Sequence, residues 1–405
     1  MSLISASCNR QQPAQQADDF DYVVDHFADI EVLRYKVPEF ENLTLNQKIL
    51  VYYLTEAALW GRDILWDQNN AANLDIRRML ETVYTSYDGP RDTDDFKAFE
   101  TYLKQVWFGN GIHHHYSTDK FTPAFSRSFL EEQLAALPAD SVPANSAELV
   151  ELIFNPALAA KRVNQAQGAD LVATSANNLY APGLTQAEVE AYYAGIKVPN
   201  DSTPISYGLN TRLARENGRI VEQQYRIGGL YSDAIEHIVE NLDSASNYAE
   251  NPAQKQIIRS LIDFYTTGDL ATFDRYSIEW AEDTASRVDF INGFIESYGD
   301  PLGMTGAWES IVNFKNNEAS ERTEILSGNA QWFEDNSPVD PRFRKPEVKG
   351  VSAKVITAAI LAGRHSYRYQ PPQCQLDTCG SRLQERDTGK HHRGIRRRKP
   401  GRWLP

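Results

Sequence analysis

Two glutamates and a tyrosine within residues 288–309 form the set of side chains best suited to chemistry. If this segment begins as a β-strand, alternate residues share one face of the strand. The expected face contains Phe290, Asn292, Phe294, Glu296 and Tyr298. The following Gly299-Asp-Pro-Leu-Gly303 is typical of a turn, which can return the chain and bring Glu309 back near Glu296.

Two carboxylates beside a phenol suit a positively charged amine that lies next to a polarised carbonyl group. Carboxylates accept charge-assisted hydrogen bonds from the amine, and a phenol can stabilise an oxyanion. The alternative is a surface hairpin whose acidic side chains are solvated. The pattern of residues alone leaves both interpretations open.

Consecutive histidines at 113–115 suggest a metal site, but the spacing disfavours it. Adjacent side chains point in different directions on a strand or a helix, so three in a row rarely bind one ion. We expect a packing role or a position at the rim of a cleft, with Tyr116 alongside. A zinc knuckle from Cys374, Cys379, His391 and His392 is poorly spaced. The prediction for metal ligands is none.

The surrounding elements are mostly helical. Apolar residues recur at helical spacing in 44–60, and Gly61 follows as a stop. Further helices are expected at 146–153, after a capping box at Thr185-Gln-Ala-Glu188, and at 233–242 and 253–265. Residues 219–227 favour a strand, and 348–360 favour a buried strand or a helix. The prediction is an α+β, helix-rich fold.

Composition excludes several classes of protein. The chain has 405 residues, long enough for one large or two medium domains, and carries 41 basic and 55 acidic side chains, a formal charge of −14. This acidity argues against nucleic acid or an anionic membrane as the main partner. No apolar run approaches the roughly 18 residues of a spanning helix. Residues 9–373 lack cysteine, so packing and not disulfides must stabilise the body.

Residues 1–19 resemble a bacterial lipoprotein N-terminus. Small residues precede Cys8, and a polar stretch that suits a flexible tether follows it. We therefore expect a lipid anchor at Cys8 and a periplasmic or outer-membrane-anchored location in the cell envelope. The alternative is an ordinary disordered N-terminus with a free thiol and a cytoplasmic protein.

The character of the chain changes after residue 363. Residues 364–405 hold 11 basic and 3 acidic side chains, and they lack apolar periodicity. One interpretation is a basic arm that binds nucleic acid. Another is a frameshift, because codons for 365–378 read one base over can encode Ile-Pro-Thr-Ala-Ile-Asn-Leu-Pro-Asn and further globular-like sequence. We expect a disordered, out-of-frame tail.

Several segments together resemble the dipeptidyl peptidase III family, and its bacterial branch in particular. They are Phe294-Ile-Glu-Ser-Tyr-Gly-Asp-Pro-Leu-Gly303 with Trp308-Glu309, Asn110-Gly-Ile-His-His-His-Tyr-Ser-Thr-Asp-Lys120, Phe154-Asn-Pro156, Trp332 to Arg342, and Glu347 to Ile356. The resemblance covers roughly residues 20–363. The out-of-frame Asn-Leu-Pro-Asn also resembles the motif that the family has next.

The resemblance implies a zinc-dependent exopeptidase that removes dipeptides from peptide N-termini. By position, Glu296 and Glu309 match the acids that bind the substrate ammonium, and Tyr298 matches the tyrosine that stabilises the tetrahedral intermediate. The implied fold has two lobes. Residues 20–316 would form a substrate-binding lobe with a five-stranded β-barrel, and 317–363 would begin the helical zinc lobe, which is largely missing.

The zinc motif of the family, His-Glu-x-x-Gly-His, does not occur in this sequence. None of the eight histidines is followed by Glu with a second His at that spacing. We therefore expect a truncated, monomeric form that interacts with peptides, binds no zinc and is inactive alone. The alternatives are a non-catalytic surface lipoprotein that binds peptides or a partner, and a nucleic-acid binder that acts through the tail.

Overall fold

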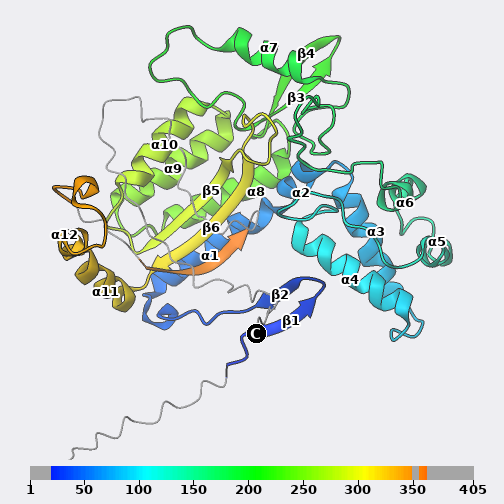
Figure 1. Ribbon diagram of the computed structural model, residues 1–405, viewed down its shortest axis with the longest axis horizontal. Coiled ribbons are helices and arrows are strands. Elements are labelled where there is room, and N and C mark those ends of the chain that lie inside the picture. The colour runs from blue at the N-terminus through cyan, green and yellow to red at the C-terminus, as the bar shows by residue number, and fades with distance from the viewer. Residues whose placement is uncertain (1–19, 349–354, 363–405) are drawn as a thin grey trace, which may run out of the picture. The chain divides into compact units, whose positions relative to one another are not determined.

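The computed structural model of the chain describes residues 20–348 and 355–362 (Figure 1). The chain divides into two units, Met1–Lys36 and Val37–Pro405. In the first unit, β1 (Val23–Phe27) pairs with β2 (Ile30–Leu33) as an antiparallel hairpin. Cys8 and residues 364–405 lie outside the described residues, so the predictions made for them stay predictions.

The second unit is dominated by helices. These are α1 (Leu45–Trp60), α2 (Arg62–Asn69), α3 (Asn73–Ser86), α4 (Asp94–Gly109), α5 (Arg127–Ala136), α6 (Ser146–Phe154), α7 (Gln186–Ile196), α8 (Ser232–Ser246), α9 (Pro252–Thr267), α10 (Leu270–Glu282), α11 (Asn317–Gly328) and α12 (Ala330–Asp335). Short 3-10 helices occupy Phe40–Asn42 and Pro341–Phe343. The strands are β3 (Thr211–Glu216), β4 (Arg219–Gln224), β5 (Val288–Glu296), β6 (Ala307–Lys315) and β7 (Ile356–Ala362).

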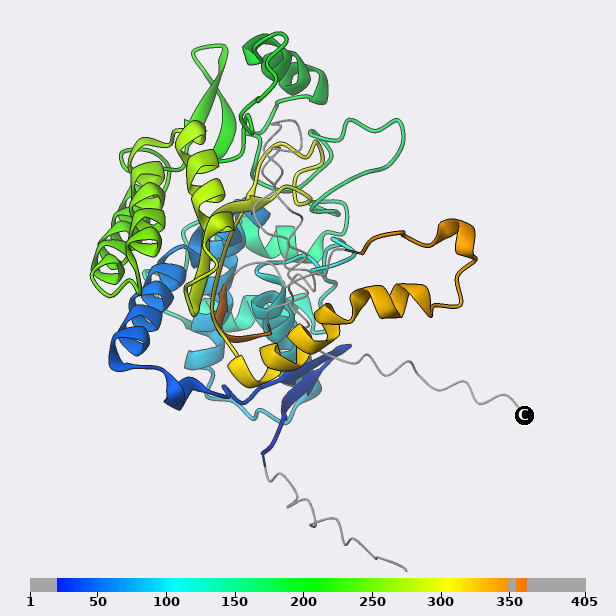
Figure 2. The ribbon, with the colours of Figure 1, turned by 90° about the vertical axis from the view of Figure 1, so that its left-hand side faces the viewer.

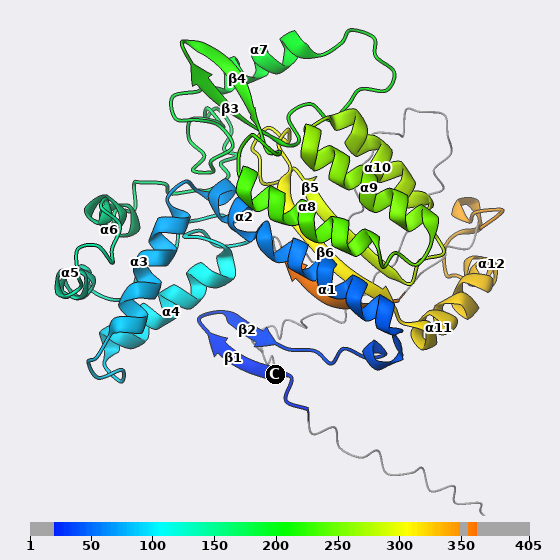
Figure 3. The same cartoon turned by 180° about the vertical axis from the view of Figure 1, so that it is seen from behind.

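An antiparallel sheet of order β5-β6-β7 forms the centre of this unit. One side of its main core comes from the strands, with Phe290, Phe294, Trp308, Val312 and Phe314. The other side comes from buried apolar residues of α1, α8, α9 and α10, which share the same cluster. Figure 3 shows α1 and α8 side by side in front of the sheet. Burial of these apolar surfaces is the main stabilising contribution to the arrangement.

A second apolar cluster holds together the helices that follow α1. It combines buried residues of α3, α4, α5 and α6 with Trp66 of α2 and residues of the 112–125 segment. Phe96, Phe99, Phe125 and Phe129 form mutual ring contacts with centroids 5.5–6.3 Å apart. Over residues 20–348 and 355–362, every helix is too short or too polar to span a bilayer.

The helix-rich α+β class predicted from the sequence is confirmed, but the five-stranded barrel is not. A barrel requires strands that pair around a closed ring. Within the described residues the strands instead form the three-stranded sheet and two separate hairpins, β1-β2 and β3-β4. The predicted capping box at Thr185 is present and begins a helix. A second capping box, at Thr44, begins the helix that the sequence predicts at 44–60.

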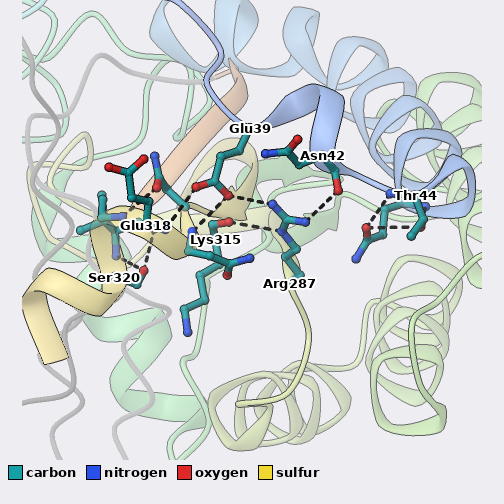
Figure 4. A network of polar contacts seen from close by, with 12 residues as sticks. Glu39, Asn42, Thr44, Arg287, Lys315, Glu318 and Ser320 are labelled. Atoms are coloured by element: carbon teal, nitrogen blue, oxygen red, sulfur yellow. Dashed lines mark hydrogen bonds and ion pairs between the residues drawn. The ribbon is translucent and has the colours of Figure 1, made fainter.

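A polar network anchors α11 to the ends of the sheet strands (Figure 4). The Glu39 carboxylate accepts hydrogen bonds from the Asn317 and Glu318 amides, both at 3.2 Å, and pairs with the Arg287 guanidinium at 2.8 Å. Burial raises the pKa of Glu39, but these donors outweigh it and hold the pKa below its usual value. The network thus fixes the position at which α11 follows β6. From there α11 and α12 extend away from the sheet, as the gold part of the ribbon in Figure 2 shows.

Candidate functional site

The candidate site lies where β5 ends and β6 begins. The two strands pair regularly from Val288 opposite Phe314 to Phe294 opposite Trp308. The register then shifts, and Glu296, not Ile295, lies opposite Ala307. Two residues of β5 therefore oppose one residue of β6, which is the geometry of a β-bulge.

The bulge decides which way Glu296 points. Residues directly opposite each other in an antiparallel pair share one face of the sheet. Glu296 opposes Ala307, and Gly293 opposes Glu309, so Glu296 and Glu309 share one face. The prediction that Glu296 continues the face of Phe290, Asn292 and Phe294 is therefore wrong. The prediction that the turn brings Glu309 back near Glu296 is confirmed by the register, since the two residues are diagonal neighbours across the strand pair. Diagonal neighbours in a regular antiparallel pair are roughly 7–8 Å apart.

The three predicted site residues differ in exposure. Glu309 lies within β6 and is only 8% exposed, whereas Glu296 at the end of β5 is partly buried. Tyr298 lies in the loop after β5 and is 53% exposed. The site thus combines two less accessible carboxylates with an exposed phenol on the residue two positions after Glu296. This arrangement can receive a cationic group at the carboxylates while the phenol remains within reach of solvent.

Gln68 of α2 holds the start of β6 in place. This fully buried side chain donates from Nε2 to the carbonyl oxygen of Gly306 at 2.9 Å. Its Oε1 accepts from the backbone N–H of Trp308 at 2.8 Å. One amide therefore satisfies two backbone groups of β6, as a neighbouring strand would, and it fixes the strand directly before Glu309.

Gly61 allows α1 and α2 to lie close to the same strand. A Cβ atom at position 61 would lie 1.9 Å from Cζ2 of the Trp308 indole, which is far below any contact distance. The indole is fully buried and its Nε1 donates to Tyr265 Oη at 3.2 Å. The glycine that the sequence predicts as a helix stop is therefore also required for packing against the residue next to Glu309.

Each of the three consecutive histidines makes contacts of its own, and the rings of His114 and His115 also stack on each other with centroids 4.4 Å apart. His113 is 1% exposed, and its Nε2 lies 2.7 Å from the carbonyl oxygen of Ala159. His114 Nδ1 accepts from the backbone amides of Tyr116 and Ser117, both at 3.1 Å. His115 places its ring edge-on to Phe108. The packing interpretation of this motif agrees with these contacts.

Lys120 joins two of the segments that the sequence marks as distinctive. Its Nζ donates to the carbonyl oxygens of Leu152, Asn155 and Leu158, at the end of α6 and just beyond it. Cationic side chains are favourable at a helix C-terminus, where carbonyl groups lack partners. The 110–120 and 154–156 segments are therefore held together by the hydrogen bonds of Lys120.

The residues that the structure describes do not fit a zinc site. Among them, no three side chains of His, Cys, Asp or Glu are arranged to bind one metal ion. Glu296 and Glu309 supply two carboxylates without a histidine or cysteine in the same group, whereas zinc sites are typically four-coordinate with nitrogen or sulfur ligands. The chemistry of the site is therefore that of carboxylates and a phenol.

Comparisons with known proteins find a peptidase family model and relatives named dipeptidyl peptidase 3. Residues 205–352, which include the whole β5–β6 hairpin, match the model of peptidase family M49. The chain is similar to dipeptidyl peptidase 3 of Dictyostelium discoideum, with 26% identity over 349 residues. It is also similar to dipeptidyl peptidase 3 of Rattus norvegicus, with 33% identity over 117 residues that cover 29% of this chain and 16% of the relative.

The fold is similar to that of solved structures whose titles name dipeptidyl peptidase III. The chain superposes on DPP III from Caldithrix abyssi with a TM-score of 0.57 and 16% sequence identity, over 84% of this chain and 54% of that one. The Dictyostelium match covers 78% of this chain and 48% of the relative. The chain thus spans about half the length of these two relatives.

Proposed function

Because the chain belongs to the dipeptidyl peptidase III family, we propose that Glu296 and Glu309 bind the N-terminal ammonium group of a peptide. The observation that supports this most directly is the shared sheet face of the two carboxylates across the β5–β6 pair. An ammonium group donates three hydrogen bonds and carries one positive charge, so one buried and one partly buried carboxylate complement it.

Tyr298 supplies the second half of the proposed site. Its phenol lies two residues beyond Glu296 and is largely exposed, so it can donate to a carbonyl oxygen near the N-terminus of a bound peptide. A donor at that position also stabilises the negative charge that develops on the oxygen when the carbonyl group is attacked. The proposed substrates are therefore peptides with a free N-terminus.

Hydrolysis requires chemistry that the described residues do not provide. The family implies zinc, but the described side chains do not form a zinc site, and the sequence lacks His-Glu-x-x-Gly-His. We therefore propose that this chain binds peptides without hydrolysing them. Dipeptide release that depends on added zinc and is abolished by a chelator would contradict this part of the proposal.

Titration of the purified chain with a short peptide, followed by calorimetry, tests the binding site. Glu296→Gln and Glu309→Gln each remove one negative charge while they keep the side-chain volume. Loss of a charge-assisted hydrogen bond is expected to weaken binding roughly 10- to 100-fold. The matched control is Glu132→Gln, which changes an exposed glutamate of α5. Equal affinity for the wild type and both site variants would contradict the proposal.

A further inference from the structure

A buried carboxylate organises the loop that carries Tyr298. Asp300 is 2% exposed and accepts hydrogen bonds from three backbone amides of its own loop. The Leu302 amide donates to Oδ1 at 2.9 Å, and the Met304 and Thr305 amides donate to Oδ2 at 3.0 and 2.7 Å. The loop between β5 and β6 is therefore wrapped around one side chain.

Tyr180, which lies outside the loop, makes a fourth hydrogen bond to this carboxylate. Its buried hydroxyl donates to Asp300 Oδ2 at 2.6 Å. The backbone on either side of Tyr180 is bonded to β3, because the Ala181 amide donates to Leu213 and the Leu213 amide donates to Leu179, at 2.8 and 3.1 Å. The hydroxyl is thus held at a fixed position relative to the β3–β4 hairpin.

Two more side chains from the same region bond to the residues on either side of Asp300. Asn177 Nδ2 donates to the carbonyl oxygen of Gly299 at 3.1 Å, and Gln165 Nε2 donates to that of Pro301 at 3.0 Å. Three consecutive loop residues therefore each accept a hydrogen bond from residues 165–180. Burial of a carboxylate is expensive unless its hydrogen bonds are satisfied, so the loop has a strong preference for this one arrangement.

These contacts fix the backbone on both sides of Tyr298. On one side, Glu296 is held by its pairing with Ala307. On the other side, Gly299 begins the set of three residues bonded to the 165–180 segment. We propose that Tyr180 and Asp300 are positioning residues, which hold the Tyr298 phenol in place relative to the two glutamates. This inference rests on the proposed peptide-binding function of the site.

Tyr180→Phe is the sharpest test, because it removes one oxygen atom and leaves the rest of the side chain. The matched control is Tyr192→Phe, which removes a hydroxyl from α7 in the apolar cluster that also contains Tyr180. Asp300→Asn is the stronger variant, and thermal unfolding shows whether each protein is folded. If Asp300→Asn does not fold, Tyr180→Phe still decides the question.

The first measurement does not depend on peptide binding. Fluorotyrosine placed at position 298 reports the surroundings of that ring by fluorine NMR. We expect its resonance to shift or broaden in Tyr180→Phe and to stay unchanged in Tyr192→Phe. Hydrogen exchange at the 302, 304 and 305 amides should be faster in Tyr180→Phe, with exchange in α9 unaltered. An unchanged Tyr298 resonance in folded Tyr180→Phe and Asp300→Asn would overturn the inference.

The second measurement asks whether Tyr180 acts through Tyr298. We expect Tyr180→Phe to weaken binding of a peptide with a free N-terminus about fivefold to tenfold in the wild-type background. In a Tyr298→Phe background the same change should have less than a twofold effect, since coupled residues are not additive. Equal effects in both backgrounds would show a merely structural role and contradict the inference. A wild type that binds no peptide would overturn the proposed function, while the fluorine signal would still decide whether Tyr180 positions Tyr298.

Discussion

Glu296 and Glu309 share one face of the β5–β6 pair because the register shifts between Phe294 and Glu296. In a regular strand, Glu296 would follow the alternation of Phe290 and Phe294, both of which are buried in the apolar core. The extra residue at the bulge turns the carboxylate to the opposite face. A single local irregularity therefore creates the pair of acids on which the proposed function depends.

If the two carboxylates bind the same ammonium group, their contributions to binding should be coupled. The double variant Glu296→Gln/Glu309→Gln is expected to lose less binding free energy than the sum of the two single variants, by about 1 kcal/mol. The reason is that the remaining carboxylate cannot hold the cation alone. Calorimetric titration of the four proteins measures this coupling. Strict additivity would indicate that the two acids contact different groups.

The contact between position 61 and Trp308 predicts that one added methyl group at position 61 lowers the stability of the fold. Gly61→Ala should destabilise the fold by about 1–3 kcal/mol, because the new Cβ overlaps the indole ring. Urea unfolding measures the loss. Gly195→Ala is the matched control, since its Cβ would meet nothing within 4 Å inside α7, and it should be neutral or stabilise by up to about 1 kcal/mol. The double variant Gly61→Ala/Trp308→Phe should recover part of the loss.

Gln68 should be important for stability, although along the chain it is more than 200 residues from Glu296, Tyr298 and Glu309. Gln68→Leu keeps the volume of the side chain but leaves the Gly306 carbonyl and the Trp308 amide without their partner. We expect a loss of about 2–4 kcal/mol, since two buried backbone groups become unsatisfied. Chemical denaturation provides the measurement, and Gln133→Leu in α5 provides the control. A loss below about 0.5 kcal/mol would show that β6 does not need the Gln68 amide.

His113 predicts a dependence of stability on pH. Burial is the main cause that lowers the pKa of His113 to about 4, below the ordinary value of 6.5. The unfolded chain therefore takes up a proton as the pH falls below about 6.5, whereas the folded chain does not until about pH 4. Stability should fall by up to about 3 kcal/mol across this window and be fully present above it.

Comparison of His113→Gln with His26→Gln separates this effect from the titration of other groups. Denaturation midpoints measured between pH 4 and pH 7 should depend less on pH in His113→Gln than in the wild type. His26→Gln, which changes an exposed histidine of β1, should keep the dependence of the wild type. An identical pH profile for wild type and His113→Gln would rule out burial of a neutral His113.

The sequence predicts the elements whose signals are local. The capping box at Thr185 marks a helix start correctly, because it depends only on residues within one turn. The strand at 219–227 is found as β4, and part of the 348–360 segment is found as β7. Helices α3 and α4 were not predicted, although their apolar residues form much of the second core.

The sequence indicates the residues of the candidate site and the return of Glu309 toward Glu296, but not the sheet face that the two acids share. The types and spacing of Glu296, Tyr298 and Glu309 indicate the chemistry, but a bulge has no signature in the alternation of side chains. The supporting residues Gln68 and Tyr180 were missed for a different reason. Their partners lie 238 and 120 residues away along the chain, and no local pattern connects them. Long-range hydrogen bonds of this kind become visible only in the folded structure.

The most direct test of the central claim compares two peptides that differ only at the N-terminus. One has a free amine and the other is acetylated, and each is titrated into the purified chain by calorimetry. The proposed ammonium site predicts measurable binding of the free peptide and at least tenfold weaker binding of the acetylated one, since the acetylated nitrogen carries no charge. Equal affinity for the two peptides, or no binding of either, would contradict it.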